Sequence, residues 1–265
     1  MIRILRNINT GTSPTYLLKH KKIKLADDKP YLLIFDNYSG PSGIFHWFAD
    51  GLTRLIEIKD IIKNYTALIP YYFLTEKIYK QTLDLFGVNN VSVIKENTYI
   101  KVKNLFVPDH IAESGNFHPE NVDKLRTFIW DKIPGKANFS KGKRIYVSRA
   151  KATRRFVTNE QQVEDLLSKF GFQTVFMEDY SFAEPVSIAY NADIFVSIHG
   201  GALTLIHFMR PQTSVLEFRN KTDEKNCNPF CLADALDINY YYLRATLFTI
   251  AKQQIILTSS LTLNS

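Results

Sequence analysis

The chain has 265 residues, of which 45% are hydrophobic, and carries a formal net charge of +7. These values exclude a disordered chain and a minimal disulfide-stapled domain, because they provide apolar residues for one large or two small globular domains. The positive charge favours an anionic partner, and nucleotides, anionic lipid surfaces and nucleic acid all fit it.

The N-terminal segment and the two cysteines indicate a compartment. The opening MIRILRNINTG lacks the sustained apolar run of a signal peptide, and no segment reaches the ~18 apolar residues of a membrane span. Cys227 and Cys231 are four residues apart, which favours helix packing over a disulfide framework or a zinc site. We therefore expect a soluble protein of the cytoplasm, with basic residues that allow a peripheral contact with the inner membrane face.

Short β-rich runs alternate with helix-period segments along the first part of the chain. The predicted strands are residues 31–35, 67–69, 91–94 and 99–107, and the predicted helices are residues 44–60, 75–86 and 119–133. The following segment, Pro134 to Lys143, is polar and rich in turn residues, so it is the best linker candidate. We place a domain boundary there, with one domain over residues 1–140 and a second over residues 141–265.

The alternation restarts after this linker. Strands are predicted at residues 144–148, 174–177, 193–198, 214–218 and 240–243, and helices at residues 159–170, 182–191, 202–209 and 229–236. Strands that alternate with helices are typical of parallel sheets with crossover helices. The sequence therefore predicts an α/β protein made of two Rossmann-like halves.

The most informative segment, IFVSIHGGALTLIHF, covers residues 194–208. An apolar strand runs into His199, Gly200, Gly201 and Ala202, and a helix-like apolar segment follows. Two glycines let the backbone turn sharply and approach a ligand, and the N–H groups at the start of a helix attract anions. This turn is therefore a candidate phosphate site, although an ordinary strand-to-helix turn has the same pattern.

Other polar residues follow neighbouring strands of the second half. Ligands of open parallel sheets bind beyond the carboxyl ends of the strands, where Arg149, His199 and Glu217 are expected to meet. Arg149, together with Arg154 or Arg155, would neutralise a diphosphate, and Glu217 would accept hydrogen bonds from a ribose hydroxyl pair. Cations, glycines and a late carboxylate in this order fit a sugar nucleotide.

These segments resemble the core of glycosyltransferase family 61, which includes bacterial surface-polysaccharide transferases. The similarity rests on RIYVSRAKATRRFVTNEQQV, on GFQTVFMEDYSFAEPVSIAYNADIFVSIHGGALTLIHFM and on SVLEFRN, within residues 143–220. A second, weaker block is GIFHWFADGLTRL, residues 43–55, which is similar to an Asn-x-x-His-x-x-x-Asp segment of the family.

The resemblance implies a GT-B fold, in which two Rossmann-like halves face a cleft, and an inverting reaction without a metal or other cofactor. The implied donor is a nucleotide sugar, most simply a UDP-sugar. The implied acceptor is a glycan or a lipid-linked glycan in surface polysaccharide synthesis. An Asp-x-Asp metal motif is absent from the sequence, in agreement with leaving-group stabilisation by cations and N–H dipoles.

The inverting reaction needs a base that deprotonates the acceptor hydroxyl. His46 and Asp50 are four residues apart in a helix-period segment, so both lie on one helix face. Either Asp50 is the base and His46 orients it, or the roles are reversed. The alternative without chemistry is that Asp50 caps the helix and His46 packs beside Trp47.

Three rival functions stay open at this point. Pro185, which stands where the family has Gln, and the short first half sustain a non-catalytic nucleotide- or glycan-binding module. A dinucleotide oxidoreductase is disfavoured, because no Gly-x-Gly-x-x-Gly follows a predicted strand. Nucleic-acid binding rests on charge alone, so we expect no nucleic acid among the partners.

Overall fold

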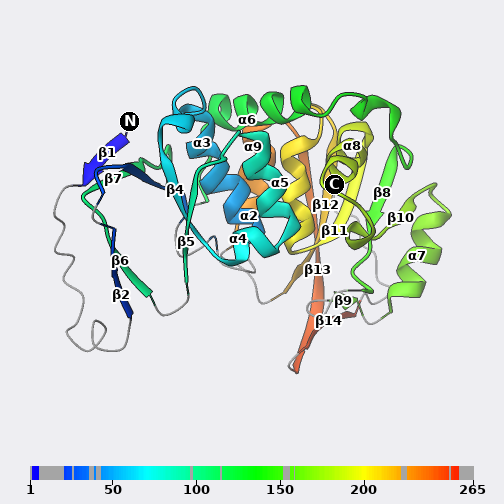
Figure 1. Ribbon diagram of the computed structural model, residues 1–265. Coiled ribbons are helices and arrows are strands. Elements are labelled where there is room, and N and C mark those ends of the chain that lie inside the picture. Colours follow the sequence, from blue (N-terminus) through cyan, green and yellow to red (C-terminus); the bar gives the residue numbers. More distant parts are fainter. Residues whose placement is uncertain are drawn as a thin grey trace. The chain divides into compact units, whose positions relative to one another are not determined.

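The computed structural model describes residues 2–5, 21–25, 27–35, 39, 43–95, 98–113, 115–151, 156–157, 159–221, 226–250 and 252–256 (Figure 1). By its internal contacts the chain divides into two compact units, residues 1–113 and 114–265. This division falls ahead of α6 (Pro119–Lys132), so α6 belongs with the second unit. The domain boundary placed at residue 140 stays a prediction.

The first unit contains a five-stranded sheet in the order β1-β7-β3-β4-β5. Its strands are β1 (Ile2–Leu5), β3 (Pro30–Leu33), β4 (Thr66–Pro70), β5 (Val91–Ile94) and β7 (Asn104–Pro108). All neighbours are parallel except β1 and β7. A second sheet pairs β2 (Lys21–Lys24) with β6 (Thr98–Lys101). The single strand predicted over residues 99–107 is therefore wrong, because this segment spans two strands that belong to different sheets.

The helix predicted from residue 44 is confirmed, and one of its turns is π-helical. It consists of α2 (Ile44–His46), the π-helical turn η1 (Trp47–Leu52) and α3 (Thr53–Glu57). Trp47 is fully buried, and its Nε1 donates a hydrogen bond to Thr82 Oγ1 at 2.9 Å. A Cβ atom on Gly51 would lie 2.6 Å from the Trp47 ring, so only glycine fits there. Among the described residues of this unit, the other helices are η2 (Ile62–Asn64), α4 (Tyr72–Thr75) and α5 (Lys77–Leu85).

The second unit contains a seven-stranded sheet in the order β10-β8-β11-β12-β13-β14-β9. The strands are β8 (Arg144–Val147), β9 (Phe156–Val157), β10 (Gln173–Val175), β11 (Ile194–Ile198), β12 (Ser214–Asn220), β13 (Asn239–Ile250) and β14 (Lys252–Ile256). From β10 to β13 all pairs are parallel, and β13 turns back antiparallel into β14. The α/β class with parallel sheets is confirmed, while the predicted strand 240–243 is the start of a longer one.

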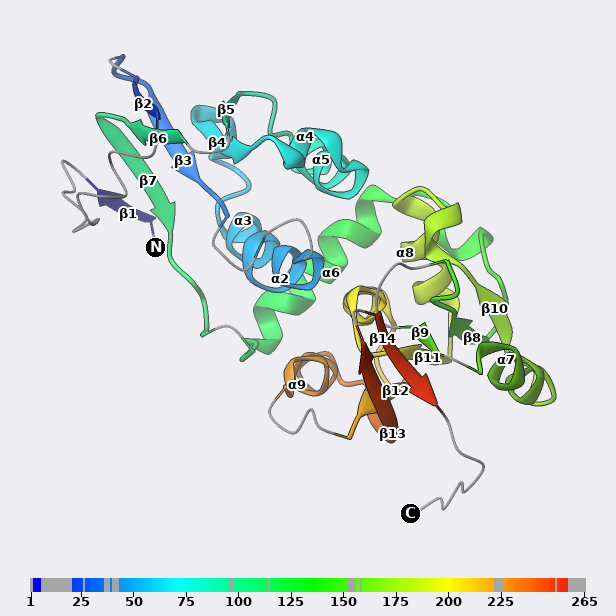
Figure 2. The same ribbon diagram turned by 90° about the horizontal axis from the view of Figure 1, so that it is seen from below.

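The helices of this unit are α6, α7 (Glu160–Ser168), α8 (Ala183–Asn191) and α9 (Asn228–Ala235), with the 3₁₀ segments η3 (Lys136–Asn138), η4 (Met177–Asp179) and η5 (Gly201–Phe208). Figure 2 shows α9 beside β13, away from α7. Buried Arg126 on α6 donates hydrogen bonds to the carbonyls of Met209 and Leu236, which ties α6 to the ends of η5 and α9. No helix in the described part of the chain is both long and apolar enough to cross a bilayer.

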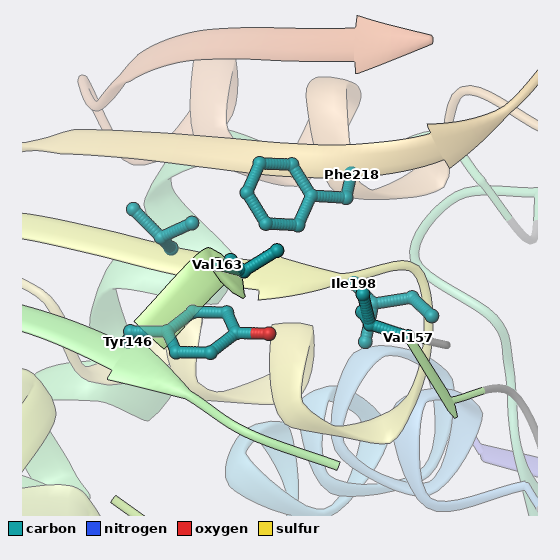
Figure 3. Close-up of a cluster of buried hydrophobic side chains, with 6 residues drawn as sticks. Tyr146, Val157, Val163, Ile198 and Phe218 are labelled. Atoms are coloured by element: carbon teal, nitrogen blue, oxygen red, sulfur yellow. The ribbon is translucent and has the colours of Figure 1, made fainter. Parts of the chain in front are cut away.

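An apolar cluster lies between α7 and the sheet of the second unit (Figure 3). Its members come from three central strands, from β9 and from α7: Tyr146, Val157, Val163, Val196, Ile198 and Phe218. The Tyr146 hydroxyl group donates to Glu160 Oε1 at 2.8 Å, so this buried ring has a partner for its polar end. The cluster holds β8, β11 and β12 in register beneath their carboxyl ends.

Candidate functional site

The carboxyl ends of β8, β11 and β12 form the edge where the sequence places the nucleotide site. The three strands are adjacent and parallel, with Ser197 opposite both Val147 and Glu217. Arg149 follows β8, and His199 follows β11 directly. The structure therefore brings these two residues and the end of β12 to one edge of the sheet, as expected for parallel strands.

The turn after β11 carries backbone donors. The His199 N–H donates to Phe218 O at 2.9 Å, which fixes the start of the turn against β12. Gly200 has φ 155° and ψ −163°, a backbone region that is essentially restricted to glycine. Leu203 donates the first hydrogen bond of η5, to Gly200 O at 3.0 Å. The N–H groups of Gly201 and Ala202 therefore precede this first bond.

The segment after this turn is a 3₁₀ helix, whereas the sequence predicts an ordinary helix over residues 202–209. Its residues from Leu203 to Phe208 are all buried, so the apolar pattern covers every side and carries no α-helical period. The N–H groups of Gly201 and Ala202 nevertheless lie at the start of the segment, and their role as phosphate donors stays a prediction.

The buried carboxylate of Glu217 orients the His199 side chain. The Nδ1 atom of His199 contacts Glu217 Oε1, and the hydroxyl group of Tyr240 donates to the other oxygen, Oε2. The His199 side chain is 21% exposed, and that of Glu217 is completely buried. Glu217 therefore presents no exposed oxygen to a ribose hydroxyl in this structure, and its visible role is to orient His199.

Two further residues complete this group. Asn226 Nδ2 lies 3.2 Å from His199 Nε2, and the backbone carbonyl of Asn226 accepts a hydrogen bond from the buried guanidinium of Arg219. Burial and the hydrogen bond to Glu217 raise the pKa of Tyr240, so its hydroxyl group keeps its proton. Neither Asn226 nor Tyr240 stands out in the sequence, because only the pairing of β13 and the start of α9 bring them to His199.

Arg149 is the first of the basic residues that follow β8. Arg149 is partly buried directly beyond the strand. Buried Ser148, just before it, donates to Glu160 Oε1 at 2.5 Å and accepts the Ala150 N–H at 3.2 Å, so the chain is anchored where Arg149 begins. Arg154 and Arg155 lie outside the described residues.

His46 and Asp50 of the first unit form a direct pair. His46 Nδ1 lies 2.8 Å from Asp50 Oδ2, across the junction of α2 with the π-helical turn. The His46 side chain is 27% exposed and that of Asp50 is 4% exposed. Arg54 Nε donates to the backbone carbonyl of Asp50 at 2.9 Å. An accessible imidazole backed by a buried carboxylate resembles the base and orienting group of acid–base catalysis.

The departure at Pro185 is accommodated without disruption. It lies in the first turn of α8, where a missing N–H costs no intrahelical hydrogen bond. The preceding Glu184 accepts both the backbone N–H and the hydroxyl group of Ser181 at 2.9 Å, and these two bonds lower the pKa of Glu184. Glu184, in the first turn of α8, thus pairs with Ser181 just before the helix.

The two cysteines are free thiols at the start of α9, and burial raises the pKa of Cys231. Within the described ranges no three His, Cys, Asp or Glu side chains gather as a candidate metal site. Metal independence stays a prediction, because it concerns the reaction.

Comparison with known families gives a match over most of the chain. The model of the family described as Glycosyltransferase 61 matches residues 44–216. The matched range begins at the helix that carries His46 and Asp50, and it includes Arg149 and the turn from His199 to Ala202. No match was found among curated proteins.

Proposed function

The chain belongs to glycosyltransferase family 61, and from this we propose that it is an inverting, metal-independent enzyme that transfers a sugar from a nucleoside diphosphate to a glycan acceptor. The donor is most simply a UDP-sugar. The acceptor is a glycan or a lipid-linked glycan, and the pathway is surface polysaccharide synthesis, with the enzyme in the cytoplasm or peripherally on the inner membrane face. The proposal includes a GT-B arrangement with a hexosyl or pentosyl donor.

The observation that carries this proposal is the His46–Asp50 pair. Asp50 accepts a hydrogen bond from Nδ1–H of His46, so that Nε2 has the lone pair that removes a proton from the acceptor hydroxyl. The buried carboxylate then stabilises the imidazolium that forms. Of the two assignments that the sequence leaves open, the exposure of the two side chains favours His46 as the base and Asp50 as its orienting partner.

The leaving group needs positive charge and donors at the other end of the reaction. We assign the diphosphate to the N–H groups of Gly201 and Ala202 and to Arg149, which follow neighbouring parallel strands. Arg154 and Arg155 stay candidates on sequence grounds. Preorganised donors of this kind stabilise the charge that develops as the glycosidic bond to phosphate breaks.

Release of free nucleoside diphosphate from a panel of sugar nucleotides tests the reaction. A transferase that acts slowly on water as acceptor is expected to release the diphosphate from its own donor, and more of it when glycan acceptors are added. A protein that binds sugar nucleotides tightly and releases none with any acceptor would be a non-catalytic binding module instead.

The first prediction concerns Arg149. Arg149→Ala is expected to weaken UDP binding by about 1–3 kcal/mol, the range for a lost charge-assisted hydrogen bond. Isothermal titration calorimetry measures this change. The matched control is Arg144→Ala at the opposite end of β8, where the guanidinium donates to Phe170 O, and this variant is expected to keep the wild-type affinity. Equal affinities of the two folded variants would remove Arg149 from the site.

The second prediction concerns metals. Transfer is expected to proceed at an unchanged rate in the presence of a chelator, because cations and N–H dipoles of the protein stabilise the leaving group. The rate is measured with and without the chelator, and again after addition of Mn²⁺ or Mg²⁺. A loss of transfer that these ions restore would contradict metal independence while leaving the family assignment intact.

A further inference from the structure

The His199 side chain is the accessible end of a hydrogen-bonded chain that runs from Tyr240 through Glu217. We propose that His199 Nε2 accepts a hydrogen bond from a hydroxyl group that flanks the diphosphate of the bound sugar nucleotide. Tyr240 and Glu217 are then positioning residues that orient the ring through Nδ1, and Asn226 marks the place of the ligand donor at Nε2. The inference rests on the proposed function, which gives the class of ligand. It adds that His199 Nε2 is the atom that recognises a hydroxyl group of this sugar nucleotide.

The first step concerns Nδ1 of His199. The Tyr240 hydroxyl group donates to Oε2 of Glu217, and the Nδ1 atom contacts Oε1 of the same carboxylate. An ionised carboxylate accepts hydrogen bonds and donates none, so the proton of this contact lies on Nδ1. Glu217 is fully buried, and its two oxygens bond protein groups. These bonds replace the hydrogen bonds from a ribose hydroxyl pair that the sequence assigns to Glu217.

The second step concerns Nε2 of His199. The Asn228 backbone N–H donates to Asn226 Oδ1 at 3.2 Å, and a backbone N–H cannot accept. This bond turns the amide nitrogen of Asn226 towards His199 Nε2, also at 3.2 Å. A nitrogen that faces an amide donor is an acceptor, so this geometry places the proton on Nδ1 and the lone pair on Nε2. A charged imidazole would require Asn226 to flip, which would set its amide nitrogen against the Asn228 N–H.

The third step concerns what such an imidazole recognises. A lone pair on Nε2 repels a phosphate oxygen and attracts a hydroxyl group. The phosphate oxygens are left to the N–H groups of Gly201 and Ala202, which follow His199 in the chain. The acceptor and the donors are therefore adjacent, as a sugar hydroxyl and a diphosphate are in a sugar nucleotide. The Asn226 amide stands at the position of that hydroxyl group, and we expect the ligand to displace it.

The protonation state is tested without any ligand. Nitrogen-15 NMR of the imidazole rings, assigned with His199→Gln, is expected to show a proton on Nδ1 and none on Nε2 of His199 at neutral pH. Asn226→Asp places a carboxylate at Nε2 and is expected to convert His199 to the doubly protonated form. A wild-type His199 that is doubly protonated, or protonated on Nε2 alone, would overturn the inference.

The ligand contact is tested by comparing UDP with its 2′-deoxy and 3′-deoxy analogues, and UDP-glucose with UDP-2-deoxyglucose. Calorimetry of the wild type is expected to show about fivefold weaker binding for one analogue, since one neutral hydrogen bond is lost. In His199→Ala that analogue and its parent are expected to bind equally. The ribose analogues and the hexose analogue identify which flanking sugar donates the hydroxyl group.

Matched tyrosine variants test the positioning residues. Tyr240→Phe removes the donor to Glu217 and is expected to reduce the penalty of the same deoxy analogue. Tyr242→Phe removes an exposed hydroxyl group two residues further along β13 and is expected to retain the full penalty. The wild type and His199→Ala could both bind UDP and lose the same affinity for the deoxy analogue. This result would overturn the inference about His199 but leave the proposed donor class intact. Failure of UDP, GDP, CDP and ADP to bind the wild type would overturn both it and the proposed donor class.

Discussion

His46→Ala is expected to lower the rate of sugar transfer by about 100-fold or more while leaving the affinity for UDP unchanged. The reason is that Nε2 of His46 takes the proton of the attacking acceptor hydroxyl in the proposed reaction, a step made only in the transition state. Steady-state kinetics with saturating donor measures the rate, and calorimetry measures UDP binding.

Carboxylate variants separate the base from its orienting group. Asp50→Asn keeps the size of the side chain but removes the charge that stabilises the His46 imidazolium, so it too is expected to reduce kcat strongly. The control is Asp60→Asn, the same change at a carboxylate that is 84% exposed, which is expected to transfer at the wild-type rate. If the His46→Ala variant is fully active and the Asp50→Asn variant is inactive, then Asp50 is the base.

The second large effect is on stability. Trp47→Ala is expected to lower the free energy of unfolding by about 3–5 kcal/mol, because it empties a fully buried site and leaves Thr82 without its indole partner. The Trp47 ring also packs against Phe73 and Tyr79, with ring centroids 4.7 Å and 5.7 Å away. Chemical denaturation followed by circular dichroism measures the change.

Trp47→Phe is the graded control. It retains an aromatic ring but loses the bond to Thr82, so we expect a smaller loss than for Trp47→Ala. A Trp47→Ala variant as stable as the wild type would show that the π-helical turn does not depend on this packing. Because Trp47 lies between His46 and Asp50 in the chain, its loss is also expected to disturb the pair and to reduce transfer.

Features that depend on neighbouring residues in the chain follow from the sequence by itself. A spacing of four residues predicts His46 and Asp50 on one helix face, and the structure pairs them directly. An apolar run followed by two glycines predicts the turn from His199 to Ala202 at the end of a strand, where the structure has it. In both cases the geometry is determined by residues only a few positions apart.

The tertiary structure alone decided which distant groups meet. The sequence makes Glu217 a candidate ligand for ribose, and the structure buries it behind His199 because β12 lies between β11 and β13 in the sheet. Tyr240 lies 23 residues from Glu217 and Asn226 lies 27 residues from His199, so no local pattern announces either contact. Hydrophobic periodicity predicts whether a side chain is buried, but it does not predict which strand or helix packs against it. The sequence by itself therefore determined most of the elements and the turn, whereas strand order and packing decided which side chains surround His199.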